Sequence, residues 1–196
     1  MLQREEVFQQ DWAPNQLLHR DREQETLLQV LGKRSNHVLL HGPSGVGKTV
    51  LVERVRERLA AEQGIETAYV ESMDAPTATV LRSVLRDLSG STPPANTPQE
   101  DLSLQLYERV NGPVAVFLDE ADDLHETTAL ERLFDVEGLA VVTVVHDADE
   151  FLAAAADRTR EQFHTGVMHV PKFGSEELAE YAIECRGWGW LGRDSR

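Results

Sequence analysis

The chain of 196 residues contains little cysteine, few aromatic side chains and no long apolar run. Its single cysteine, Cys185, excludes a disulfide within the chain and a metal cluster built on cysteine thiolates. The longest apolar run, Leu139–Val145, is too short to cross a bilayer. The first residues, Met1–Val7, mix both charges and lack the basic-then-apolar order of a secretory signal. We therefore expect a cytoplasmic protein without membrane contact.

Lysine is also scarce. The chain has 34 acidic and 19 basic residues, a formal net charge of −15, and its lysines are Lys33, Lys48 and Lys172. Such a composition is typical of a halophilic protein, because concentrated salt screens the repulsion between like charges. An acidic protein at ordinary salt is the alternative, and composition does not separate the two. Because DNA affinity depends largely on Lys and Arg, we expect DNA contact to be indirect or weak.

The apolar pattern alternates between strand-like runs and amphipathic helical stretches. The predicted strands are His37–His41, Glu66–Glu71, Val114–Leu118, Leu139–Val145 and Val167–Val170. The predicted helices are Arg20–Leu31, Val50–Ala61, Thr77–Leu88, Ser103–Val110, Thr127–Phe134 and Ser175–Cys185. This alternation predicts an α/β domain with a doubly wound, mainly parallel five-stranded sheet and helices on both faces.

Between the first strand and the next helix lies the stretch HGPSGVGKT, from His41 to Thr49. It matches the P-loop, or Walker A, pattern, in which glycines let backbone N–H groups turn toward an anion. Lys48 would reach the terminal phosphates, and Thr49 would offer its hydroxyl to Mg²⁺. The sequence therefore predicts binding of ATP or ADP with Mg²⁺. The residues expected to hold the nucleotide here are Gly42, Pro43, Ser44, Gly45, Val46, Gly47, Lys48, Thr49 and Val50.

An acidic pair, Asp119 and Glu120, follows the apolar strand Val114–Leu118. Mg²⁺ prefers oxygen ligands and keeps several waters, so Asp119 is the expected second metal residue. Glu120 can act as the general base on an attacking water. Acidic pairs are common where strands end, so the pair alone is a weak signal. Together with the P-loop, it indicates a Walker B-like metal site. A glutamate placed to activate water favours hydrolysis over phosphoryl transfer to a small molecule.

With Asp119–Leu124 (DEADDL) in place, the sequence resembles AAA+ ATPases, and among them the archaeal replication initiators related to origin-recognition-complex and cell-division-control ATPases. The resemblance runs from about Asp11 to Tyr181 and begins with the entry segment Asp11–Glu23. In that family the entry segment borders the adenine pocket, which implies nucleotide contacts for Pro14 and Arg20.

Two later stretches extend the resemblance. Val141–Asp147 resembles the sensor-one strand, with His146 where the family has asparagine; this implies a contact to the γ-phosphate or to water, and a strand-end histidine without a role is the alternative. Ala156–Phe163 resembles the arginine-finger segment, with Arg158 at the finger position and Arg160 as second choice. Such a finger acts on the nucleotide of a neighbouring subunit. Two solvated helix arginines are the alternative.

The resemblance implies an AAA+ nucleotide-binding core at residues 1–171 and a truncated lid-like helix and tail at 172–196. The rest of the lid and the winged-helix domain of the family have no counterpart in the sequence, and Glu71 and Ser72 replace an Asn-Cys pair. The implied function is Mg²⁺-dependent ATP binding and hydrolysis by a relative of replication initiators, working as a homo-oligomer or with other AAA+ subunits. The alternatives are a nucleotide-binding regulatory or scaffold subunit with little turnover, and a signalling or defence-type P-loop ATPase.

Overall fold

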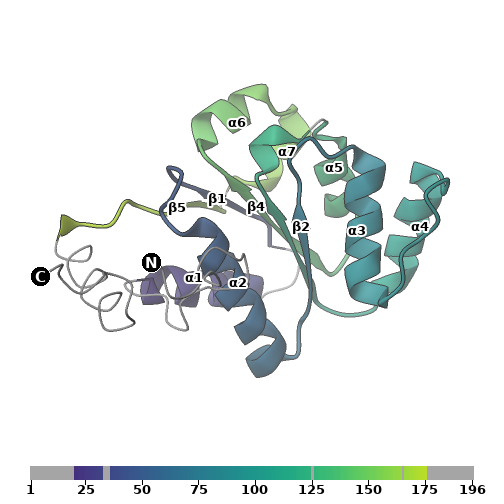
Figure 1. The fold of residues 1–196 in the computed structure, drawn as a ribbon, viewed down its shortest axis with the longest axis horizontal. Helices are drawn as coiled ribbons and strands as arrows, with labels where there is room; N and C mark the ends of the chain where they lie inside the picture. The colour runs from purple at the N-terminus through teal and green to yellow at the C-terminus, as the bar shows by residue number, and fades with distance from the viewer. Residues whose placement is uncertain (1–19, 33–35, 125, 165, 176–196) are drawn as a thin grey trace, which may run out of the picture.

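The computed structural model describes residues 20–32, 36–124, 126–164 and 166–175, and these form one α/β unit around a parallel sheet (Figure 1). Pro14 lies outside the described residues, as does the predicted helix Ser175–Cys185 beyond its first residue. The five strands have the order β2-β3-β4-β1-β5, and every pairing is parallel. Their bounds are β1 Val38–His41, β2 Glu66–Glu71, β3 Val114–Asp119, β4 Leu139–Val145 and β5 Val167–His169. The predicted doubly wound parallel sheet is therefore confirmed.

Helices cover both faces of the sheet. One face carries α1 (Asp21–Leu31) and α2 (Lys48–Arg58), and the other carries α3 (Thr77–Ser89), α4 (Gln99–Arg109) and α5 (Thr128–Phe134). Two short helices that the sequence reading missed, α6 (Ala148–Ala154) and α7 (Asp157–Gln162), follow β4. Among the described residues, no helix is long and apolar enough to cross a membrane.

Several predicted helix bounds were wrong. The helix predicted at Val50–Ala61 already begins at Lys48 and continues past Arg58 as a short π-helix, Leu59–Gln63. The helix predicted at Ser103–Val110 begins at Gln99, directly after Pro98. Its first turn carries two carboxylates, which the positive end of a helix dipole stabilises, so an apolar pattern alone places its start too late.

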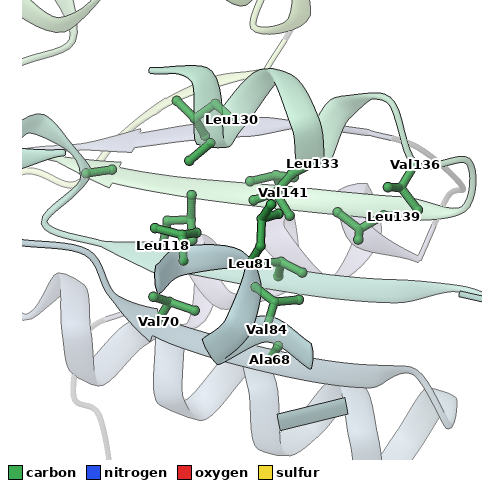
Figure 2. Packing of buried hydrophobic residues seen from close by; sticks show 14 of the residues in the cluster. Ala68, Val70, Leu81, Val84, Leu118, Leu130, Leu133, Val136, Leu139 and Val141 are labelled. Atoms are coloured by element: carbon green, nitrogen blue, oxygen red, sulfur yellow. The ribbon is translucent and has the colours of Figure 1, made fainter. Parts of the chain in front are cut away.

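The central strands are buried on both sides, which is why they read as continuous apolar runs. All residues of β3 and β4 are buried. Successive residues of β3 point to opposite faces of the sheet. Leu118 packs with Leu81 and Leu130 on the face covered by α3 and α5 (Figure 2). Phe117 packs on the face covered by α1 and α2. This double burial fixes the register that aligns the strand ends.

His37 lies just before β1 and is 8% exposed. Its Nδ1 accepts a hydrogen bond from the Val141 N–H at 3.2 Å, and its ring lies 4.4 Å from that of Phe134, centroid to centroid. Burial disfavours the charged imidazolium and lowers the pKa of His37 from 6.5 to about 4. The folded protein thus keeps His37 neutral across a range in which the unfolded chain is protonated.

We expect the His37→Asn variant, whose amide oxygen can accept the same hydrogen bond, to lose this pH dependence. Because the folded pKa is depressed, the contribution of a neutral His37 is fully present above pH 6.5 and is lost as the pH falls toward 4. The wild type should lose about 3 kcal/mol of unfolding free energy relative to the variant over that interval. Denaturant unfolding of both proteins at a series of pH values and one salt concentration measures the difference, and parallel curves would contradict the prediction.

Candidate functional site

The loop between β1 and α2 has the backbone of a phosphate-binding loop. Gly47 is the N-cap of α2 with a φ of 87°, a left-handed conformation that favours glycine. A Cβ on Gly42 would lie 2.3 Å from the carbonyl oxygen of Val170, so only glycine fits there. The loop therefore leads directly into the N-terminus of α2, where backbone N–H groups and the helix dipole favour an anion.

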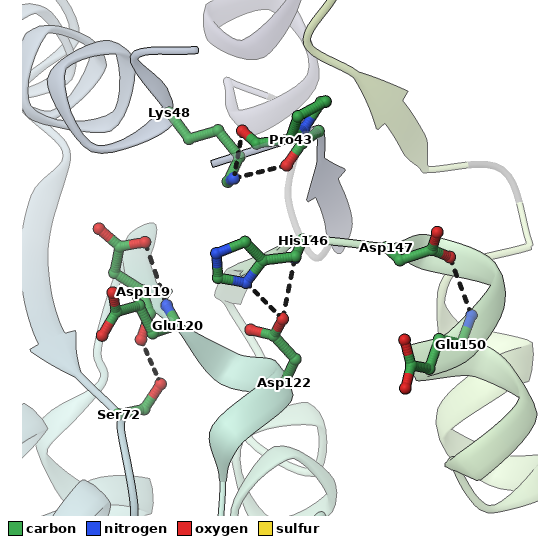
Figure 3. Close-up of polar contacts among 10 residues, drawn as sticks. Pro43, Lys48, Ser72, Asp119, Glu120, Asp122, His146, Asp147 and Glu150 are labelled. Atoms are coloured by element: carbon green, nitrogen blue, oxygen red, sulfur yellow. Dashed lines mark hydrogen bonds and ion pairs between the residues drawn. The ribbon is translucent and has the colours of Figure 1, made fainter. Parts of the chain in front are cut away.

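Lys48 is the first residue of α2 and is buried except for 9% of its surface. Its Nζ donates to the carbonyl oxygens of Gly42 at 2.6 Å and Pro43 at 3.1 Å (Figure 3). Burial lowers the pKa of Lys48, while the carboxylates of Asp119, Asp122 and Glu120 oppose that shift. A cation is thus held at the mouth of the loop, as phosphate binding requires.

Asp119 ends β3 and is 4% exposed. Its Oδ2 accepts hydrogen bonds from the hydroxyl groups of Thr49 and Tyr69, each at 2.8 Å, and its Oδ1 accepts the Glu120 N–H at 3.1 Å. Thr49 and Asp119, the two expected metal residues, are therefore in direct contact. A hydroxyl and a carboxylate side by side are oxygen donors of the kind that Mg²⁺ takes, so these residues fit the ion.

Two residues that the sequence reading did not assign to the site support Asp119. Ser72 donates to the Asp119 carbonyl oxygen with both its hydroxyl, at 2.5 Å, and its N–H, at 2.9 Å. Serine at the position where the family has cysteine therefore anchors the end of β3. Burial, and then the neighbouring Asp119, raise the pKa of Tyr69, so its hydroxyl stays protonated and donates.

Glu120 follows Asp119 in the left-handed region, with φ 55° and ψ 43°. For a non-glycine residue this conformation costs on the order of 1 kcal/mol. Its Oε2 is buried, and no described protein group bonds to it. A buried carboxylate oxygen normally has a partner, so this atom is suited to accept a hydrogen bond from water.

His146 comes directly after β4 and faces the same space. Its N–H and its Nδ1 both contact Oδ2 of Asp122, at 3.0 and 2.6 Å (Figure 3). Asp122 was not predicted as a site residue, although it belongs to the quoted DEADDL stretch. Its carboxylate fixes the orientation of the imidazole across the gap between the ends of β3 and β4.

These strand ends enclose one cavity of about 240 Å³. Its lining combines the phosphate loop, the acidic residues after β3 and the end of β4: Ser44, Gly45, Gly47, Lys48, Thr49, Asp119, Glu120, Asp122, Val144, Val145 and His146. The structure thus brings together most of the predicted site residues. Gly42 and Pro43 contribute carbonyl oxygens to Lys48, while Val46 and Val50 lie outside the lining.

Arg20 lies outside this lining. It is 2% exposed, and its Nη2 donates to the carbonyl oxygens of Val46 at 3.2 Å and Pro171 at 2.7 Å. Its guanidinium lies 4.2 Å from the centroid of the Phe173 ring. Arg20 therefore ties the start of α1 to the phosphate loop and to the segment after β5.

The two candidate finger arginines lie on α7, away from the cavity lining. Arg158 is exposed and pairs with Asp135. Arg160 donates to the Ala155 carbonyl oxygen at 2.6 Å and pairs with Asp157, so its side chain is bound to its own segment. Of the two, Arg158 is the more accessible to a neighbouring molecule.

A phosphate loop after β1, an acidic pair at the end of β3 and a polar side chain after β4, on a parallel sheet, define the class of P-loop NTPases. The chain belongs to the AAA ATPase domain family, which matches residues 16–145. It is similar to the ORC1-type DNA replication protein 1 of Halobacterium salinarum, with 26% identity over 193 residues that cover 93% of this chain and 63% of the relative.

Solved structures share the fold. The Aeropyrum pernix ORC2 protein, determined as ADPNP and ADP complexes, superposes with a TM-score of 0.72 at 23% identity and covers 98% of this chain. Cdc6p from Pyrobaculum aerophilum gives a TM-score of 0.74 at 20% identity and covers 96% of this chain. This chain spans 57% and 54% of those two chains. The AAA+ fold of replication initiators, expected from the sequence, is confirmed.

We expect Arg20→Met to destabilise the fold by about 2–4 kcal/mol, because two carbonyl oxygens lose a charged donor beneath the phosphate loop. Arg22→Met is the matched control: Arg22 is exposed on α1, and its replacement should change stability by less than about 0.5 kcal/mol. Denaturant unfolding of the three proteins at one salt concentration tests this. Equal stability of the two variants would show that the Arg20 contacts contribute little.

Proposed function

We propose that this chain binds ATP with Mg²⁺ and hydrolyses it, as an AAA+ ATPase that works in DNA replication initiation. The observation that carries the proposal is the single cavity in which Lys48, Thr49, Asp119 and Glu120 meet. Its relatives named as ORC1-type replication proteins support the biological context. Because the chain spans only 63% and 57% of those two relatives, their whole activity comes to this chain only as a proposal.

In the proposed reaction, Lys48 and the N–H groups at the start of α2 bind the phosphates. Lys48 exchanges its bonds to the Gly42 and Pro43 carbonyl oxygens for stronger, charge-assisted bonds to a phosphate. Thr49 and Asp119 would hold Mg²⁺, which neutralises phosphate charge when bound. Glu120 accepts the proton of the attacking water at its buried Oε2. His146, oriented by Asp122, leaves its Nε2 for a phosphate oxygen or a water.

The proposal extends to three further features. The core is assigned to residues 1–171 and the start of a lid-like element to 172–196. A halophilic setting is supported by the net charge of −15 and by the relatives in Halobacterium salinarum and Haloarcula marismortui. The same acidic charge favours indirect or weak DNA contact by this chain. Other AAA+ subunits would then supply the remaining DNA contacts.

Two variants separate binding from hydrolysis. Lys48→Ala should weaken ATP binding about 100-fold, because a bond between charged groups is lost. Glu120→Gln should bind ATP normally and slow single-turnover hydrolysis by about 10² to 10⁴. Lys172→Ala, at an exposed position, is the control and should match the wild type in both assays.

The outcomes of that experiment are distinct. Unchanged ATP binding by Lys48→Ala in high salt would refute the nucleotide site. If the wild type binds ATP but hydrolyses it no faster than Glu120→Gln does, the regulatory or scaffold alternative would be favoured.

Arg158 offers a test of assembly, since we propose that it acts on the nucleotide of a neighbouring subunit. Arg158→Ala should reduce hydrolysis by about 10³ or more. A mixture of Arg158→Ala with Glu120→Gln should regain activity, because one variant supplies an intact site and the other an intact finger. Activity of the mixture no greater than the sum of its parts would exclude Arg158 as a finger, and the same mixing experiment with Arg160→Ala tests the second choice.

A further inference from the structure

Tyr69 is placed beside the metal site by the register of the sheet. It lies on β2, opposite Phe117 of β3, two residues before the pairing of Glu71 with Asp119. Because side chains two residues apart share one face of a sheet, Tyr69 and Asp119 both face α2. The Tyr69 hydroxyl donates to Asp119 Oδ2 at 2.8 Å.

The position of the Tyr69 ring is fixed by other contacts. The guanidinium of Arg56, on α2, lies 5.0 Å from the ring centroid. The backbone N–H of Tyr69 donates to Oδ2 of Asp87, on α3, at 3.1 Å. A tyrosine ring with only two side-chain torsions, packed in this way, presents its hydroxyl at a defined point.

The hydroxyl meets the same carboxylate oxygen as Thr49 does. A hydroxyl has one proton and two lone pairs, so Thr49 can donate to Asp119 and still offer a lone pair to a cation. Tyr69 approaches Asp119 from β2 and Thr49 approaches it from α2. The two donors together favour one orientation of the Asp119 carboxylate, which is 4% exposed.

We propose that Tyr69 is a positioning residue of the magnesium site: its hydroxyl holds the Asp119 carboxylate in the orientation in which, with Thr49, it takes Mg²⁺. This inference rests on the proposed function. It assigns a role to a strand residue outside both the phosphate loop and the acidic pair. The competing interpretation is that Tyr69 only fills space between β2 and α2.

The test is Tyr69→Phe, which removes the hydroxyl and keeps the ring. Binding of the fluorescent nucleotide mant-ATP is measured in EDTA and across a Mg²⁺ titration at constant ionic strength. Residues that support metal ligands typically change metal affinity by 10- to 100-fold. The half-saturating Mg²⁺ concentration should therefore rise about tenfold, while mant-ATP affinity in EDTA stays at the wild-type value.

Tyr107→Phe is the matched control, since Tyr107 lies on α4 and is 61% exposed. It should leave both measurements unchanged, and thermal unfolding of all three proteins reports any general loss of stability. A Tyr69→Phe protein with the Mg²⁺ requirement of the wild type, or with mant-ATP affinity lowered equally in EDTA and in Mg²⁺, would overturn the role of Tyr69 alone. A wild type that binds no mant-ATP in either condition would overturn the proposed function and this inference with it.

Discussion

The site depends on parallel pairing of β1 and β3 with β4, which lies between them. Val145 pairs with His41, and Thr143 pairs with Leu118, so the residues that follow all three strands emerge at one edge of the sheet. Because each of these strands is buried on both faces, a shift of one residue would turn apolar side chains away from their layers. The core therefore fixes the distances among Lys48, Asp119 and His146 before any ligand is present.

The edge of the sheet where these strands end holds a nearly buried lysine, although the chain as a whole is strongly acidic. Lys48 is nearly buried and lies among Asp119, Glu120 and Asp122, while the protein as a whole carries a formal charge of −15. The Gly42 and Pro43 carbonyl oxygens accept hydrogen bonds from the Lys48 ammonium group, and the Asp119 carboxylate accepts hydrogen bonds from hydroxyl and N–H donors. Lys48 and the N–H groups at the start of α2 are therefore the groups of this edge that favour a phosphate, and they lie beside carboxylates that favour a cation.

The sequence was sufficient to predict the sheet and the placement of the phosphate loop and the acidic pair at its edge, because these depend on local spacing. It did not indicate Tyr69 or Asp122, whose contacts to Asp119 and His146 depend on register and loop path between distant segments. The short helices α6 and α7 were missed for a similar reason. Each spans about two turns or fewer and buries only one or two residues, which is too few to set a helical period in the sequence. The resemblance implies a nucleotide contact for Arg20, which stays a prediction; its hydrogen bonds to the Val46 and Pro171 carbonyl oxygens depend on distant segments and were not predicted.

The hydrogen bonds around Asp119 add side-chain contacts to the backbone pairing of β2 with β3, and they join both strands to α2. Thr49 connects Asp119 to α2. Tyr69 connects it to β2, and Ser72 connects it to the turn that follows β2. The Glu120 N–H donates to the other carboxylate oxygen, Oδ1. Donors from α2 and β2 therefore share Oδ2 of one nearly buried carboxylate, so the orientation of Asp119 depends on both elements at once.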